Sequence, residues 1–155
     1  MAISRDIGLG RAFWRQSLAD AEEARILLSN GRIVSALVSC QHTIEKALKA
    51  VLFIEIGENN FQLRHNMSVE LGKSIRLQLP LRDMNSLQAL EDILPLGGVA
   101  GKTRRNTEYP WSTTLLSTRV YHPHAMFRSR LQAQRFLALY DRIQFRVRNA
   151  FPELS

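Results

Sequence analysis

The sequence predicts an all-α fold, an up-and-down bundle of four to five helices, and three observations lead to this prediction. Apolar residues recur at helical spacing through most of the chain, and no stretch shows strand alternation longer than three or four residues. The chain has 155 residues, of which 45% are hydrophobic and 23% charged, which is typical of one domain with a packed core. We therefore expect residues 1–155 to form a single helical domain.

The first two predicted helices are the most regular part of the pattern. Residues 11–28 carry an apolar stripe, and the Asn30-Gly31 pair behind it is a helix stop signal. Residues 33–56 carry a second stripe, formed by Ile33, Leu37, Cys40, Ile44, Leu48 and Val51. Two long helices joined by so few residues must pack as an antiparallel hairpin. On the flank of the second helix, Glu45 and Lys49 form an i,i+4 pair that a solvent-facing surface explains most simply.

The centre of the chain is less regular. A short helix is predicted after Ser68, and its candidate core residues are Val69, Ile75 and Leu79. Pro80 suits the first turn of a further helix, whose apolar stripe ends before Pro95. Between residues 95 and 123 the periodicity disappears, and we expect a long irregular insertion there, because a connection of this length is typically functional or disordered.

A final long helix is predicted over residues 123–149. Its core stripe consists of Met126, Ala133, Phe136, Leu137, Tyr140, Ile143 and Val147. Four arginines share the opposite side within about 40° on a helical wheel, and we expect this side to offer its guanidinium groups outward: Arg128, Arg135, Arg142 and Arg146. Beside them runs a second apolar stripe of Phe127, Leu131, Ala138 and Phe145. This second stripe is either covered within the chain or contacts a partner subunit.

The net charge of the chain sits in its last third. Residues 1–99 contain 11 Lys/Arg and 11 Asp/Glu, whereas residues 100–155 contain 10 against 3, which accounts for the whole net charge of +7. Arginine outnumbers lysine by 17 to 4, and the planar guanidinium group suits phosphates and stacking on bases. A neutral scaffold with an arginine-rich C-terminal segment predicts an anionic partner. Nucleic acid is the first candidate for this partner and an acidic protein is the second.

The second helix carries a family resemblance. Residues 36–50 read ALVSCQHTIEKALKA, which is similar to the HEPN domain pattern of a small residue, Gln, Ala or Thr, Glu-Lys, then Lys-Ala. Residues 64–67 (RHNM) resemble the family's Thr-His-Asp-Leu segment, and the likeness covers residues 11–79 well and the last helix loosely. The resemblance implies a small helical bundle of the kind found in prokaryotic toxin–antitoxin pairs and some ribonucleases, and it implies a homodimer.

The resemblance also implies a catalytic motif, in which an arginine is followed after four to six residues by a histidine at the start of the last helix. Arg119 and His124 have this spacing and location. Histidine transfers protons near neutral pH, and arginine stabilises charge that builds up on phosphate oxygens. The pair is therefore the candidate catalytic site of a metal-independent endoribonuclease. Val120 and Pro123 depart from the family pattern.

A second candidate binding segment lies in the irregular region. Its cations are Lys102, Arg104 and Arg105, and they precede the stackable rings of Tyr109 and Trp111. Cations interleaved with aromatic rings suit single-stranded RNA. The alternative is a basic loop whose aromatic residues pin it to the bundle.

The sequence lacks the features of several classes of protein. It has no run of 18 apolar residues, its first residues lack a secretory leader pattern, and Cys40 is the only cysteine. We therefore expect a cytoplasmic protein that does not contact a membrane and has no disulfide. Apart from Glu108, no Cys or carboxylate lies near His122 and His124 in the sequence to complete a metal site, so we expect neither metal nor cofactor.

Two functions remain open at this point. The first is a dimeric, toxin-like HEPN protein that binds RNA and cleaves it through Arg119 and His124. The second is a non-catalytic helical module that partners a separately encoded nucleotidyltransferase, as the resemblance also implies. The placement of the motif favours the first function, whereas Val120 and Pro123 favour the second.

Overall fold

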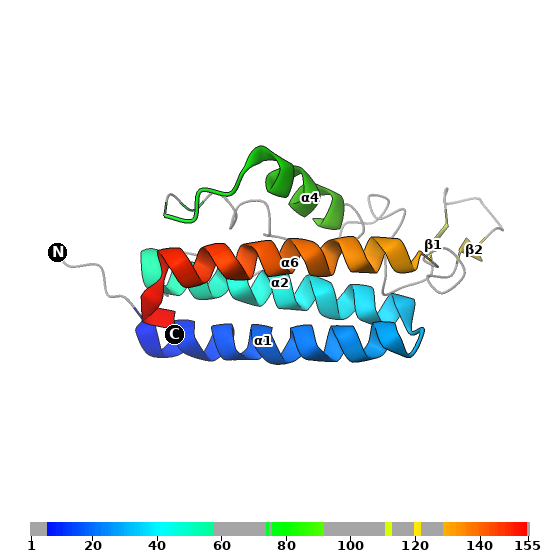
Figure 1. Cartoon of the computed structure of the whole chain (residues 1–155), viewed down its shortest axis with the longest axis horizontal. Coiled ribbons are helices and arrows are strands. Elements are labelled where there is room, and N and C mark those ends of the chain that lie inside the picture. Colours follow the sequence, from blue (N-terminus) through cyan, green and yellow to red (C-terminus); the bar gives the residue numbers. More distant parts are fainter. Residues whose placement is uncertain are drawn as a thin grey trace.

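In a computed structural model of the chain, three long helices lie side by side and a shorter helix rests on one of them (Figure 1). The structure describes residues 6–57, 74, 76–91, 111–112, 120–121 and 129–154. The helices within these ranges are α1 (Ile7–Ser29), α2 (Ile33–Glu55), α4 (Leu81–Glu91) and α6 (Arg130–Ala150), and a 3-10 turn, η2 (Pro152–Leu154), follows α6. The predicted all-α bundle is confirmed.

The α1–α2 hairpin has a local cause at each of its ends. Asp6 caps α1, because its Oδ1 accepts a hydrogen bond of 2.8 Å from the backbone N–H of Leu9. At the turn into α2, Gly31 has a φ of 73°, a left-handed conformation that glycine adopts without steric cost. Gly10 allows the two helices to approach closely, because a Cβ there would lie 3.2 Å from the carbonyl oxygen of Ala50.

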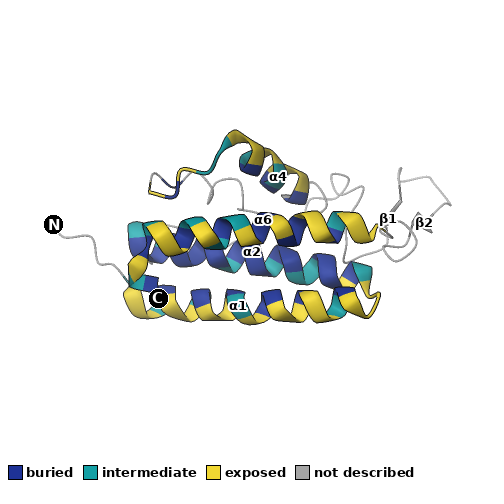
Figure 2. Cartoon of the chain, viewed as in Figure 1, coloured by how far each residue is buried: buried dark blue, intermediate teal, exposed yellow. Residues whose placement is uncertain are grey.

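The hydrophobic core lies between α1, α2 and α6, whose buried faces turn toward one another, and Leu87 and Leu90 of α4 extend it (Figure 2). The largest fully buried side chains include Leu37, Ile44, Leu48, Phe53, Leu139, Tyr140 and Ile143. All described members of the core stripe predicted for the last helix are buried, which confirms the stripe. None of the helices in the described ranges is long and apolar enough to cross a membrane.

The segment before α4 differs from the prediction. The short helix was expected to reach Leu79, but residues 76–77 form a turn, residues 78–80 are irregular, and Gln78 has a left-handed φ of 47°. The hydroxyl of Ser74 accepts a hydrogen bond of 3.2 Å from the N–H of Leu77, which favours a turn over a helix. Val69 and Ile75 lie outside the described residues, whereas Leu79 packs against the core.

The irregular insertion contains a strand pair that the sequence did not predict. The strands β1 (Trp111–Ser112) and β2 (Val120–Tyr121) are antiparallel, and Trp111 lies opposite Tyr121. Strands of two residues are too short for an alternating pattern to reveal them. The rest of residues 95–123 lies outside the described residues.

The last helix begins later than predicted. We expected it to start near Pro123, but α6 starts at Arg130, after Ser129 in an extended conformation. The hydroxyl of Ser129 accepts a hydrogen bond of 3.3 Å from the backbone N–H of Gln132, as an N-cap residue does. Serine competes for backbone hydrogen bonds and therefore favours a helix start over a helix interior. Met126, Phe127 and Arg128 lie outside the described residues.

Candidate nucleic-acid interface

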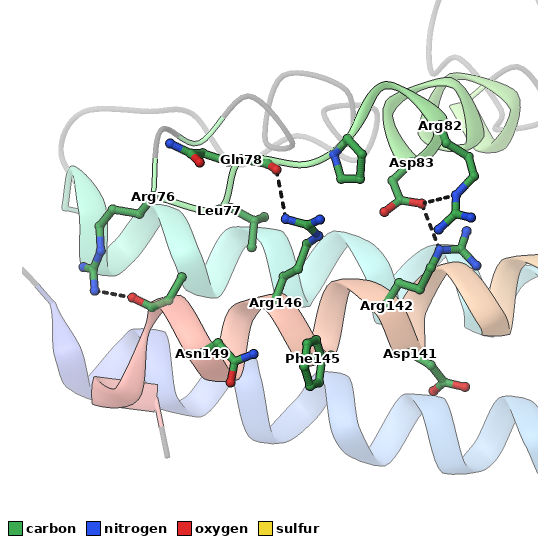
Figure 3. A pocket seen from close by; sticks show the side chains of 12 residues that line it. Arg76, Leu77, Gln78, Arg82, Asp83, Asp141, Arg142, Phe145, Arg146 and Asn149 are labelled. Atoms are coloured by element: carbon green, nitrogen blue, oxygen red, sulfur yellow. Dashed lines mark hydrogen bonds and ion pairs between the residues drawn. The ribbon is translucent and has the colours of Figure 1, made fainter.

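An arginine-lined cavity of about 710 Å³ lies between α6 and the segment that leads into α4 (Figure 3). Residues 76–83 form one wall, and residues 141–150 of α6 form the other. Its cationic lining residues are Arg76, Arg82, Arg142 and Arg146, and its acidic lining residues are Asp83 and Asp141. We call this cavity the arginine groove. Its lining carries more positive than negative charge, so it favours an anionic ligand.

Asp83 holds Arg142 in the wall of the groove. Arg142 Nε donates a hydrogen bond of 2.9 Å to Asp83 Oδ1, and the Nε of Arg82 lies 3.6 Å from the same oxygen. The Asp83 side chain is only 1% exposed, and its Oδ2 has no hydrogen-bond partner. An acidic residue three positions after an N-cap often bonds back to the N-cap N–H. Pro80 has no N–H, so Asp83 is left to pair with α6.

Arg146 contacts the same wall one turn further along α6. Its Nη1 donates a hydrogen bond of 3.1 Å to the backbone carbonyl of Gln78, the residue with the left-handed φ. Arg146 has five N–H donors, and this contact uses one of them. Arg142 likewise bonds to Asp83 through Nε, which leaves its two Nη groups for a ligand.

Arg76 closes one end of the groove and is occupied by the protein itself. Its Nη2 donates hydrogen bonds to the carbonyl of Ala150 at 2.5 Å and to the carboxylate of Glu153 at 3.1 Å. Its guanidinium group also stacks over the Phe151 ring, 4.1 Å from the ring centroid. Arg76 therefore fastens the C-terminal turn to the segment before α4 and is not a free cation.

The predicted arginine stripe is present on α6 but is less open than expected. Arg142 and Arg146 share the groove, whereas Arg135 is exposed and lies outside it, and Arg128 is outside the described residues. Arg142 is paired with the carboxylate of Asp83, contrary to the expectation of outward-facing guanidinium groups, whereas Arg146 bonds, within the described residues, only to the backbone carbonyl of Gln78. A helical wheel shows which residues share a face, but it does not show what else packs there.

The predicted catalytic pair and the predicted basic loop fall outside the part of the chain that the structure describes. Arg119, His124, Lys102, Arg104 and Arg105 all lie outside the described residues. The two described residues between Arg119 and His124 form β2, which ends nine residues before α6 begins. We expected this motif at the start of the last helix; α6 begins at Arg130, six residues after His124 in the sequence, and Ser129 caps it.

Glu45 and Lys49 are also placed differently from the prediction. They form the expected ion pair within α2, but both side chains are buried, so the solvent-facing interpretation is wrong. Lys46, which is partly exposed, instead binds Asp20 of α1 through a contact of 2.5 Å. The Lys46–Asp20 pair joins α2 to α1, and periodicity within one helix could not show that Glu45 and Lys49 are covered.

Cys40 and Tyr140 are titratable groups of the core. Burial raises the pKa of the Cys40 thiol from 9.0 to about 12, so the thiol stays protonated and unreactive near neutral pH. This confirms the prediction that Cys40 is a packing residue. Burial also raises the pKa of Tyr140, although its hydroxyl contact with Ser17, at 3.5 Å, opposes the shift. Within the described ranges, no three His, Cys, Asp or Glu side chains gather closely enough to hold a metal ion.

Comparison with known sequences adds one finding. The sequence profile of the HEPN domain matches residues 11–93. No curated protein and no solved structure matches the chain. The matched region includes most of α1, all of α2 and α4, and the wall of the arginine groove formed by residues 76–83, whereas α6 lies beyond it.

Proposed function

The chain belongs to the HEPN domain family, and we propose that it is a toxin-like, RNA-binding protein whose arginine groove contacts the phosphates of a bound RNA strand. One observation carries the proposal: Arg82, Arg142 and Arg146 gather along one cavity and retain unused N–H donors. The fork of donors on a guanidinium group matches the oxygens of a phosphate. The concentration of the net charge in the C-terminal third supports the same ligand.

Binding of a labelled RNA, measured by fluorescence anisotropy at several salt concentrations, tests the proposal. We expect Arg142→Ala and Arg146→Ala each to weaken binding about tenfold and to reduce the salt dependence by about one counterion. Arg148→Ala is the matched control, because Arg148 is exposed on the same helix but does not line the groove. Affinity that does not fall as salt rises, or equal losses in all three variants, would contradict the proposal.

We further propose that the protein is a metal-independent endoribonuclease in which Arg119 and His124 act on the strand, with Lys102, Arg104 and Arg105 binding its phosphates. The spacing of Arg and His and the family membership support this step. The test is incubation of labelled RNA with the purified protein in EDTA. We expect cleavage by the wild type and none by Arg119→Ala or His124→Ala. Cleavage that persists in both variants, or no cleavage by the wild type, would reject the assignment.

A second candidate function is a non-catalytic interaction module. The observation that favours it is the exposure of two large apolar side chains on α6, Leu131 at 54% and Phe145 at 68%. The partner would be a second copy of the chain or a separately encoded nucleotidyltransferase. Light scattering of the purified protein distinguishes a homodimer from a monomer, and Leu131→Glu should dissociate a dimer formed through this side of α6. A monomer at high concentration would reject the homodimer.

A further inference from the structure

Phe145 is an exposed aromatic residue in the α6 wall of the arginine groove. Its side chain lines the arginine groove on α6, next to Arg142 and Arg146. In Figure 3 the ring and Asn149 lie on α6 below the two arginines, which point toward the segment between Gln78 and Asp83. Residues three and four apart on a helix share one face, so Phe145 lies beside Arg142 and Asn149, while Arg146, the next residue in the chain, turns toward Gln78.

The neighbours of the ring show which ligand it fits. A protein partner that covers an exposed ring gains most when further apolar area surrounds it. Around Phe145 the lining combines arginine, aspartate and asparagine with the smaller apolar residues Leu77, Pro80 and Ala150. The other large exposed apolar residue of α6, Leu131, lies about 21 Å away along the helix. A ring beside guanidinium groups suits a nucleotide, because the flat base stacks on the ring while the phosphate accepts the N–H donors.

We infer, building on the RNA-binding function proposed above, that Phe145 is a base-stacking platform and that the arginine groove holds one unpaired nucleotide by its base and phosphate together. The adjoining phosphate accepts hydrogen bonds from the Nη groups of Arg142 and from the remaining N–H donors of Arg146. Asn149, one turn further on, offers both a donor and an acceptor to the edge of the base.

Asp83 is a positioning residue in this arrangement. It holds Arg142 through Nε and Oδ1, which fixes the guanidinium plane while the Nη groups stay available. The carboxylate is buried, so it keeps its contact while solvent or a ligand occupies the open side of the groove. The ligand therefore meets an arginine whose orientation is already set, which lowers the entropy cost of binding.

Stacking on Phe145 can be observed directly with Phe145→Trp. We expect a uridine oligonucleotide to quench the fluorescence of this variant, and an abasic sugar-phosphate strand of the same length to leave it unchanged, because the abasic strand has no base to stack. Leu131→Trp is the matched control on the same helix outside the groove, and we expect no quenching there. Trp14 and Trp111 are present in both variants and give the same background.

Affinity measurements separate stacking from apolar packing and from phosphate binding. We expect Phe145→Ala and Phe145→Leu to weaken binding of the uridine strand by about 5- to 100-fold, because one stacked base is lost. Both variants should bind the abasic strand as the wild type does, and Phe145→Tyr should retain full binding. Full binding by Phe145→Leu, or absence of quenching in Phe145→Trp while RNA still binds, overturns the platform and leaves the RNA-binding function standing. If the wild type binds neither strand at low salt, both proposals fail.

Discussion

The two sides of α6 are held by different kinds of contact. On the side of α2, Ile143 and Val147 are fully buried in the common core. On the side of α4, Leu87 and Leu90 also join the core, but Arg142 and Arg146 reach across to Asp83 and to the carbonyl of Gln78. Buried apolar contacts leave no room for a ligand, whereas partly exposed guanidinium groups keep donors that a ligand can use. The core therefore sets the fold, and the α4 side is where binding can be built.

The largest expected effect is a charge placed in the core. Ile44→Asp buries an unpaired carboxylate at a position that is 0% exposed, and we expect the chain to lose its cooperative thermal unfolding transition in circular dichroism. Ile26→Asp is the control, because Ile26 is 55% exposed on α1, and it should change the free energy of unfolding by less than about 0.5 kcal/mol. A folded Ile44→Asp protein would contradict the placement of the core.

The reactivity of Cys40 measures how well that core excludes solvent. With its pKa raised to about 12, the thiol has about a thousandfold less thiolate at pH 8 than an ordinary cysteine, so alkylation of the native protein should be slower by at least this factor. Cys40→Ala combined with Ser35→Cys places an exposed thiol on the same helix and should react at the ordinary rate. Fast alkylation of native Cys40 would show that the helices separate readily.

The raised pKa of the Cys40 thiol also makes the free energy of unfolding depend on pH. Because the folded state has the higher pKa, the protonated thiol is favoured by folding, and the stabilisation is complete below pH 9. The free energy of unfolding should fall as the pH rises from about 9 to about 12. Part of this fall should disappear in Cys40→Ala. The part that remains should include the contribution of Tyr140, whose pKa is raised as well. An identical slope in Cys40→Ala would contradict the assignment.

A smaller effect is expected on the α4 side. Asp83→Asn removes the charge that holds Arg142, and we expect a loss of about 1–2 kcal/mol, because the arginine is partly exposed and regains water. Hydrogen exchange should then accelerate in α4 while the amides of α1 and α2 keep their protection. Equal acceleration in all helices would show that the two sides of α6 are not independent.

The smallest effect is expected at Gln78. Gln78→Gly removes the steric cost of a left-handed φ and should raise the free energy of unfolding by up to about 1 kcal/mol in urea titrations. Gln78→Ala keeps a Cβ and is the control, for which we expect no gain. RNA binding should be unchanged in both variants, because the contact with Arg146 is made by the backbone carbonyl.

The helix hairpin and the core stripe of α6 could be predicted, because both follow from periodicity within one element. The partner of Arg142 could not, since Asp83 lies 59 residues away and nothing in the helical pattern relates the two. The burial of Glu45 and Lys49 was missed for the same reason: an i,i+4 pair looks the same on a covered and an uncovered face. A local signal for Asp83 did exist, since it lies three residues after a proline at a helix start.

By itself the sequence determined that the chain is helical, where the hairpin turns and which third of the chain carries the positive charge, because these are local or additive properties. Only the tertiary structure decided which arginines bond to other parts of the protein, where α6 begins, and that Phe145 shares a groove with Arg142 and Arg146. These properties depend on which segment packs over which face, and that depends on contacts between residues far apart in the chain.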